Sequence, residues 1–220
     1  MKLPKNKVLD RLSIIEKLII NKNVLHIGFT DYPFTQKKFE DGTLFHTQIM
    51  KSCKFLAGID LNAESVNFLK TQGVENIFPC DLYELNQLKE LSNCQFDFVL
   101  FSEVIEHLPN PGLALKTINK FIQNNNPDAK LILTAPNYNN FIFRFTDTIL
   151  NTERVHPDHY YYFSYRTLSK LLFDNNFEVI DFKFVLYRNK NRLLLMLPKL
   201  LNLFSSSFMP YLYFLAKSKT

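Results

Sequence analysis

Cysteine and glycine are both scarce in this sequence of 220 residues, which has three cysteines and five glycines. Cys53, Cys80 and Cys94 are scattered, odd in number and without the spacing of metal ligands. Their pattern argues against a disulfide framework and favours a reducing compartment. A signal peptide is also missing, because Asp10 and Arg11 interrupt the apolar residues that follow the first lysines. We therefore expect a cytoplasmic protein.

No run of lysine or arginine dominates the chain, although its formal net charge is +5 and its pI is near 9.0. The 26 basic residues are spread among 21 acidic ones, without a basic stripe or an appended binding module. This pattern argues against a nucleic-acid partner. The mild basicity fits phosphorylated substrates or a place near anionic lipid, and a genome rich in A and T would explain it equally well.

Long apolar runs are absent as well. The stretch from Leu193 to Phe204 is interrupted by Pro198 and Lys199, and it is shorter than the ~20 apolar residues that span a bilayer. We therefore expect no transmembrane segment and interpret residues 192–204 as a helix that packs on the sheet. An interfacial helix that gives peripheral membrane contact is the alternative.

Short apolar segments of strand type alternate with segments of helical periodicity. The expected strands are residues 24–28, 55–59, 76–80, 96–101, 130–135, 177–187 and 211–216. The expected helices are residues 8–20, 43–54, 62–73, 82–91, 168–175 and 192–204, with a loop at 30–41. This alternation predicts an α/β fold with a doubly wound, mostly parallel sheet and helices on both faces. The length suits a single domain over residues 1–220.

Residues typical of ligand sites stand at the ends of the first three expected strands. Gly28 ends the first strand, but Thr30 and Tyr32 follow where further glycines would complete a G-x-G-x-x-G pattern, so that signal is weak alone. Asp60 ends the second strand, and Asp81 follows the third. Because open α/β sheets bind ligands at the carboxyl ends of their strands, these residues predict a nucleotide-type site with a ribose at Asp60.

A family resemblance is carried by five motifs in order: residues 24–28, 58–60, 80–82, 96–108 and 131–137. Together with residues 159–163 and 176–179, they resemble class I S-adenosylmethionine-dependent methyltransferases over residues 24–217. The resemblance implies a Rossmann-like sheet of seven strands whose last strand, residues 211–216, is antiparallel. It also implies an N-terminal helix (1–22), a cofactor-binding half (24–137) and a substrate-side half with the C-terminal strands (138–220).

The resemblance assigns the S-adenosylmethionine site to residues that follow the first four strands. Gly28 would let the backbone approach the methionine portion, Asp60 would accept hydrogen bonds from the ribose, and Asp81 would meet the adenine amine. The full expected set is His26, Gly28, Phe29, Asp60, Leu61, Asp81, Leu82 and Ser102. The family usually has an acidic residue where His26 stands, so the contact to the amino group of the cofactor falls to water or to another residue, such as Asp31, or is lost.

Catalytic residues are expected just after the fourth strand and near residue 159. His107 is the first candidate base, because the histidine pKa suits proton transfer near neutral pH. His159 and His156 are the next candidates, and Glu103 lies beside Ser102 beneath the expected sulfonium. A capping or packing role is the alternative for His107.

The simplest interpretation includes no metal. The alternative uses Glu103, Glu106 and His107, whose spacing places them on one turn, with His159 completing a site for a divalent cation such as Mg²⁺. Such a cation would lower the pKa of an acceptor hydroxyl.

The expected acceptor is a small hydroxylated molecule, namely a sugar or nucleotide sugar of a surface-glycan pathway. The segment from Leu25 to Gly28 and the loop from Asp31 to Pro33 resemble methyltransferases of bacterial polysaccharide synthesis. Two alternatives stay open: a quinone or lipid-phenol O-methyltransferase, and a non-catalytic subunit that binds the cofactor and supports a partner enzyme. The sequence does not predict an oligomeric state.

Overall fold

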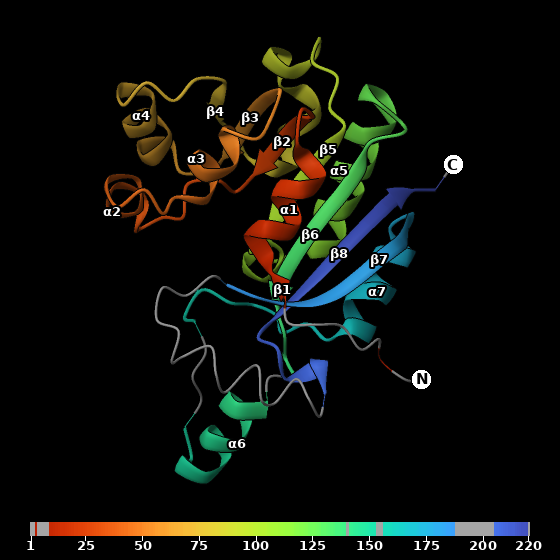
Figure 1. Cartoon of the computed structure of the whole chain (residues 1–220). Coiled ribbons are helices and arrows are strands. Elements are labelled where there is room, and N and C mark those ends of the chain that lie inside the picture. Colours follow the sequence, from red (N-terminus) through yellow and green to blue (C-terminus); the bar gives the residue numbers. More distant parts are fainter. Residues whose placement is uncertain (1–2, 4–8, 140, 153–155, 188–204, 220) are drawn as a thin grey trace.

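The computed structural model describes residues 3, 9–139, 141–152, 156–187 and 205–219, and its centre is a single twisted sheet (Figure 1). The strands of this sheet are β1 (Leu9–Asp10), β2 (Asn23–Ile27), β3 (Phe55–Asp60), β4 (Ile77–Pro79), β5 (Phe98–Ser102), β6 (Lys130–Pro136), β7 (Phe177–Leu186) and β8 (Tyr211–Ser218). Their order across the sheet is β1-β7-β8-β6-β5-β2-β3-β4.

Strand β8 runs antiparallel to both of its neighbours, β6 and β7, while the other pairs are parallel. The mostly parallel, Rossmann-like sheet with an antiparallel last strand is therefore confirmed. The sheet has eight strands and not seven, because Leu9 and Asp10 pair with the end of β7. The Asp10 side chain also accepts a hydrogen bond from Ser13 N, so the first helix begins at Arg11 and not at residue 8.

The helices of the described residues are α1 (Arg11–Ile19), α2 (Thr35–Glu40), α3 (Phe45–Met50), α4 (Ala63–Thr71), α5 (Pro111–Asn125), α6 (Phe141–Leu150) and α7 (Tyr165–Asp174). Two of them, α5 and α6, were not expected from the sequence, and α2 interrupts the expected loop at 30–41. The expected helix at 82–91 is a pair of 3-10 helices, Leu82–Gln87 and Lys89–Leu91. The expected helix at 192–204 lies outside the described residues.

The two faces of the sheet bury alternate residues of each strand. Leu25 and Ile27 of β2 belong to the larger core, which α5 and α7 cover. Val24 of the same strand belongs to a second core, which α1 and α3 cover on the opposite face. This packing holds the carboxyl ends of the parallel strands at one common edge. Among the described residues, no helix is both long enough and apolar enough to cross a membrane.

Candidate functional site

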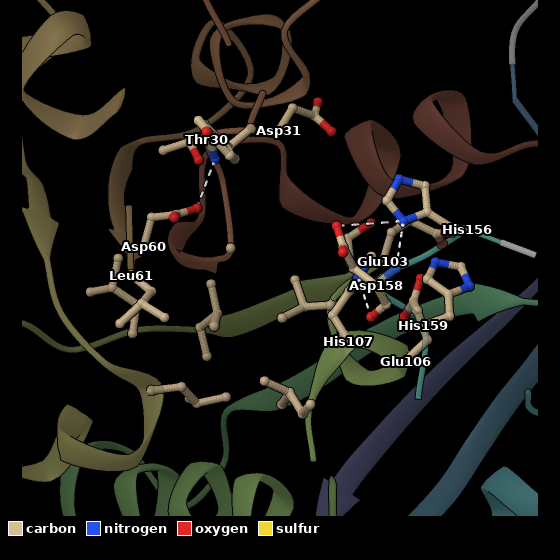
Figure 2. Close-up of a pocket in the computed structure, with 18 of the residues that line it drawn as sticks. Thr30, Asp31, Asp60, Leu61, Glu103, Glu106, His107, His156, Asp158 and His159 are labelled. Atoms are coloured by element: carbon tan, nitrogen blue, oxygen red, sulfur yellow. Dashed lines mark hydrogen bonds and ion pairs between the residues drawn. The ribbon is translucent and has the colours of Figure 1, made fainter. Parts of the chain in front are cut away.

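A cavity of about 520 Å³ opens at the carboxyl ends of β2, β3, β4 and β5. Figure 2 shows that Asp60 and Leu61 lie at one end of it, while the histidines His107, His156 and His159 lie at the other end. The two ends are built differently. Backbone geometry shapes the first end, and side chains from distant segments form the second.

Gly28 forms the turn that ends β2 and lines the cavity. Its φ is +71°, and a Cβ atom there would lie 2.2 Å from Val104 Cγ2. Only glycine fits such a turn without strain. The turn itself thus requires Gly28, in addition to the close approach of a ligand that the sequence suggested.

Asp60 ends β3 with its carboxylate held by two backbone amides. Thr30 N donates to Oδ2 at 3.0 Å, and Asn62 N donates to Oδ1 at 2.9 Å. Each oxygen keeps a further lone pair that can accept from a ligand. Leu61, which is 74% exposed, lies directly beside this carboxylate and offers an apolar surface to the same end of the cavity.

Asp81 and Leu82 follow β4 and also line the cavity. The Asp81 carboxylate accepts a hydrogen bond from Tyr83 N at 2.9 Å and so begins the 3-10 helix Leu82–Gln87. Leu82 is buried within the larger core and presents an apolar edge to the cavity. A carboxylate beside an apolar side chain is an arrangement that can recognise the amine and the ring of an adenine.

His26 and Phe29 are the two expected cofactor residues that do not line the cavity. Both are 1% exposed. His26 points to the face covered by α3, where its Nδ1 lies 3.2 Å from Nδ1 of the buried His46. The Phe29 ring centroid lies 4.6 Å from that of His46. The structure thus corrects this part of the expectation, because strand alternation directs His26 to the face of Val24 and away from the ligand edge.

Ser102 and Glu103 lie at the end of β5, where an unexpected arginine joins them. Arg11 is only 6% exposed, and its Nη1 donates to Ser102 Oγ at 2.6 Å and lies 3.8 Å from Glu103 Oε1. The rings of Phe45 and Tyr187 cover the guanidinium, at 4.4 and 3.9 Å from Arg11 Cζ. Burial raises the pKa of the Glu103 carboxyl, and the charge of Arg11 opposes that rise.

Glu106 is 1% exposed and lies one turn further along the chain, in the 3-10 helix Ile105–His107. Within the described residues its Oε2 has no hydrogen-bond partner. Burial, together with the nearby charge of Glu103, raises its pKa well above the ordinary value. The sequence placed Glu106 only in a possible metal site, whereas the structure makes it a buried acid at the edge of the cavity.

Three histidines meet at the second end of the cavity. His107 follows β5, and His156 and His159 lie in a turn some fifty residues later, yet nitrogen atoms of all three lie within 4.8 Å of one another. Burial is the main cause that lowers the pKa of His107, and burial together with the other two histidines lowers that of His159 to about 4. His107 and His159 are therefore neutral at pH 7.

The metal site considered from the sequence is not the one that the structure assembles. Glu103 lies beside Arg11. In the described part of the chain, the side chains that lie close enough together to hold an ion are His107, His156 and His159, whose nitrogen atoms lie within 4.8 Å of one another. Magnesium prefers oxygen ligands, so this group of nitrogen atoms gives no support to the Mg²⁺ ion that the sequence offered only as an alternative.

The charged side chains that line the cavity, apart from the histidines, are all acidic. Among the described residues that line it there is no lysine or arginine, and there are six acidic side chains: Asp31, Asp60, Asp81, Glu103, Glu106 and Asp158. Such a lining favours a cationic or hydroxylated ligand over an anionic one.

Arg11 and Asp158 are the site residues that sequence reasoning missed. Arg11 stands at the first position of a helix, where an acidic residue would suit the helix dipole better. This mismatch was the available signal. Asp158 accepts from His107 through its backbone carbonyl, at 3.2 Å, and backbone contacts of this kind leave no mark in a sequence.

Comparison with known proteins agrees with this architecture. A family model described as a methyltransferase domain matches residues 32–181, which are 150 of the 220 residues. No curated protein matches the chain.

Three solved structures illustrate the likeness in fold. A SAM-dependent methyltransferase from Archaeoglobus fulgidus is 17% identical, with a TM-score of 0.54 and coverage of 94% of both chains. One from Aquifex aeolicus is 14% identical, with a TM-score of 0.58 and coverage of 94% of this chain and 89% of that one. The N-methyltransferase NodS from Bradyrhizobium japonicum, in complex with S-adenosyl-L-homocysteine, is 15% identical, with a TM-score of 0.52 and coverage of 96% and 83%. The chain belongs to the family of class I S-adenosylmethionine-dependent methyltransferases.

Proposed function

We propose that this methyltransferase moves a methyl group from S-adenosylmethionine to a hydroxyl group of a small neutral acceptor, and that the acceptor is a sugar of a surface-glycan pathway. The observation that carries the proposal is the acidic cavity that begins at the carboxylate of Asp60 and ends at the histidines. When bound, S-adenosylmethionine supplies a methyl group on a positively charged sulfur; transfer forms a carbon–oxygen bond, leaves a neutral thioether and releases the hydroxyl proton.

The residues at the first end of the cavity fit this cofactor. Asp60 would accept hydrogen bonds from the two ribose hydroxyls with the lone pairs that Thr30 N and Asn62 N leave free. Leu61 and Leu82 would contact the adenine ring, and Asp81 its amine. The turn at Gly28 would admit the methionine portion, and Ser102 would lie beneath the sulfonium. The carboxylates of the lining would favour the positive charge at sulfur.

The residues at the second end would serve the acceptor. Nearly all the help that methyl transfer needs is alignment of the acceptor and removal of its proton. His107 is neutral at pH 7 and lines the cavity, so we assign it the role of the base that removes the proton from the acceptor hydroxyl. His159 would orient the acceptor, since a pKa of about 4 makes it a weak base. Glu103, beside Ser102, would fix the floor of the site through Arg11.

A sugar fits this end better than an anionic acceptor does. Tyr160, next to His159 in the chain, is 67% exposed and would offer its ring to a pyranose face, whereas the ring of Tyr161, 41% exposed, stacks on that of Phe163. Because the described lining holds no lysine or arginine, a nucleotide sugar would have to keep its diphosphate outside the cavity. The three free cysteines agree with a cytoplasmic place for this reaction.

A quinone or lipid phenol is the second candidate acceptor, and one observation favours it. Helix α6 extends away from the sheet in Figure 1, and its Phe145, Ile149 and Leu150 are all exposed. Apolar side chains of this kind could pack against an isoprenoid tail of the acceptor. If the enzyme methylates a phenolic quinone precursor but neither free nor activated sugars, the phenol is the acceptor and the sugar is not.

Titration calorimetry with S-adenosylmethionine and its demethylated product tests the cofactor part of the proposal. We expect saturable binding by the wild type and a weakening of about 1–3 kcal/mol in Asp60→Ala, through the loss of charge-assisted hydrogen bonds. Asp128→Ala is the matched control, because Asp128 is an exposed aspartate outside the cavity, and we expect its affinity to equal that of the wild type. Equal affinity in Asp60→Ala would contradict the assigned site.

The acceptor part needs turnover. Methyl transfer to a sugar or activated sugar, detected by mass spectrometry, would support the enzyme as proposed. Tight cofactor binding with no transfer to any sugar, nucleotide sugar or phenol would instead favour the non-catalytic partner subunit.

A further inference from the structure

We infer that His107, His156 and His159 form a binding site for a divalent transition-metal ion of the zinc type, at the acceptor end of the cavity. The three side chains line the cavity and lie close together (Figure 2). Nothing in their sequence positions makes them neighbours, since His107 and His156 are 49 residues apart. The fold brings them together.

The three histidines lie close enough together to share one ion. Each histidine offers one nitrogen atom, and the three atoms lie within 4.8 Å of one another. Ring centroids are 4.5 Å apart for His107 and His159, 5.5 Å for His107 and His156, and 5.2 Å for His156 and His159. In a tetrahedral site with zinc–nitrogen bonds of about 2.0–2.1 Å, such atoms are roughly 3.4 Å apart. Small rotations of the side chains would therefore close the site around an ion.

Backbone hydrogen bonds hold the segments that carry the three histidines. His159 N donates to His156 O at 3.0 Å and closes the turn that carries both residues. Tyr160 N donates to Glu106 O at 2.9 Å and fastens this turn to the 3-10 helix of His107. The backbone that carries the three histidines is thus held in place before any ligand arrives, and preorganisation of this kind lowers the cost of binding.

Hydrogen bonds to the histidine rings determine which nitrogen atoms are available to a metal ion. His107 Nδ1 lies 3.2 Å from the carbonyl oxygen of Asp158. Because a carbonyl oxygen can only accept, Nδ1 carries the proton and Nε2 is left with its lone pair, as in histidines that ligate metals. His156 Nδ1 accepts a long hydrogen bond of 3.3 Å from Asp158 N, which a metal bond at the same lone pair would replace. The Asp158 carboxylate lies 3.8 Å from that nitrogen.

The chemistry of the ligands selects the ion. Three imidazoles suit zinc, cobalt, nickel or copper, whereas magnesium and calcium require oxygen ligands. Three protein ligands also leave a fourth position open, as catalytic zinc sites do. The buried Glu106, whose Oε2 has no partner among the described residues, is a neighbouring acid that a bound water could satisfy.

A role of this ion in methyl transfer rests on the proposed function. An ion in the open cavity would lower the pKa of an acceptor hydroxyl, and His107 would then be a ligand and not the base. Binding of the ion does not depend on that function, so the two proposals can fail separately.

Cobalt(II) is the probe, because its visible absorption reports coordination by nitrogen ligands. The full chain, without a histidine tag and after removal of metals by a chelator, is titrated with cobalt(II) and then with zinc(II) in competition. We expect one ion per chain, displacement of cobalt by zinc, and no displacement by magnesium in large excess. His156→Ala and His159→Gln should each weaken cobalt binding about tenfold or more.

Tyr160→Phe is the matched control. It alters the same turn and keeps an exposed ring, so cobalt affinity should equal that of the wild type. The thermal midpoint and the calorimetry with S-adenosylmethionine, measured on the same samples, show whether each variant is folded. Cofactor binding without cobalt binding, or cobalt binding that none of the histidine variants weakens, would overturn the metal site. Cobalt binding without cofactor binding would instead overturn the proposed function.

Discussion

The two ends of the cavity are prepared in different ways. At the first end, the φ of Gly28 and the amides of Thr30 and Asn62 fix the ligand-facing groups, so backbone geometry does most of the positioning. At the second end, acids and histidines from residues 102–107 and 156–159 face one another, and burial moves the pKa of several of them. The backbone of the fold therefore shapes the first end, whereas the second end depends on particular side chains.

The largest expected effect comes from a substitution that strains the backbone at the first end of the cavity. Gly28→Ala adds a Cβ atom at φ +71° and 2.2 Å from Val104 Cγ2, and we expect the free energy of unfolding to fall by about 2–4 kcal/mol. Gly42→Ala is the matched control, with φ +63° but open space around the new atom, and should cost only about 1–2 kcal/mol. Urea unfolding measures both, and equal losses would show that the contact with Val104 relaxes freely.

A smaller effect separates the second end from the first. In chelator-treated protein, His107→Gln should lower turnover about a hundredfold by loss of a base, with the affinity for S-adenosylmethionine unchanged. Because burial lowers the pKa of His107 below 6.5, wild-type turnover should be flat near neutral pH and decline only in acid. That decline should be missing in the variant. A parallel loss of cofactor affinity would show that the two ends are not independent.

The smallest effect concerns the buried histidines beneath the first end. Burial lowers the pKa of His46 to about 3, whereas in the unfolded chain it is near 6.5. The unfolded state therefore binds more protons below pH 6.5, and the free energy of unfolding should fall by about 2 kcal/mol from pH 7.5 to pH 5 for this residue. Urea unfolding at the two pH values measures the loss. His46→Leu should reduce it, and an undiminished loss would assign it to other groups.

The sequence predicted the part of the molecule that local patterns determine. Apolar segments with regular spacing located the strands, and Asp60 and Asp81, which the sequence placed at strand ends, line the cavity. Even the orientation of His26 was visible in principle, because it alternates with Leu25 and Ile27, which face the larger core. His26 is buried beside His46 on the opposite face and does not line the cavity.

The second end of the cavity could not be predicted, because contacts between segments far apart in the sequence build it. Arg11 reaches Ser102 across 91 positions of the chain, and Asp158 reaches His107 across 51. Neither contact repeats in a periodic pattern, so no local signal announces it. Helix α5 is a different case, because the sequence does carry a local signal for it: Asn110 and Pro111 are a strong helix start.

The position of β8 has a consequence for synthesis on the ribosome. This strand is translated after both β6 and β7, yet it lies between them in the sheet and is hydrogen-bonded to both. Until residues 211–218 emerge, β7 has no place to join β6, and β1, which pairs with β7, has no connection to the rest of the sheet. The part of the sheet from β2 to β5 can thus form before residues 211–218 are translated, whereas β7 and β1 can join it only afterwards.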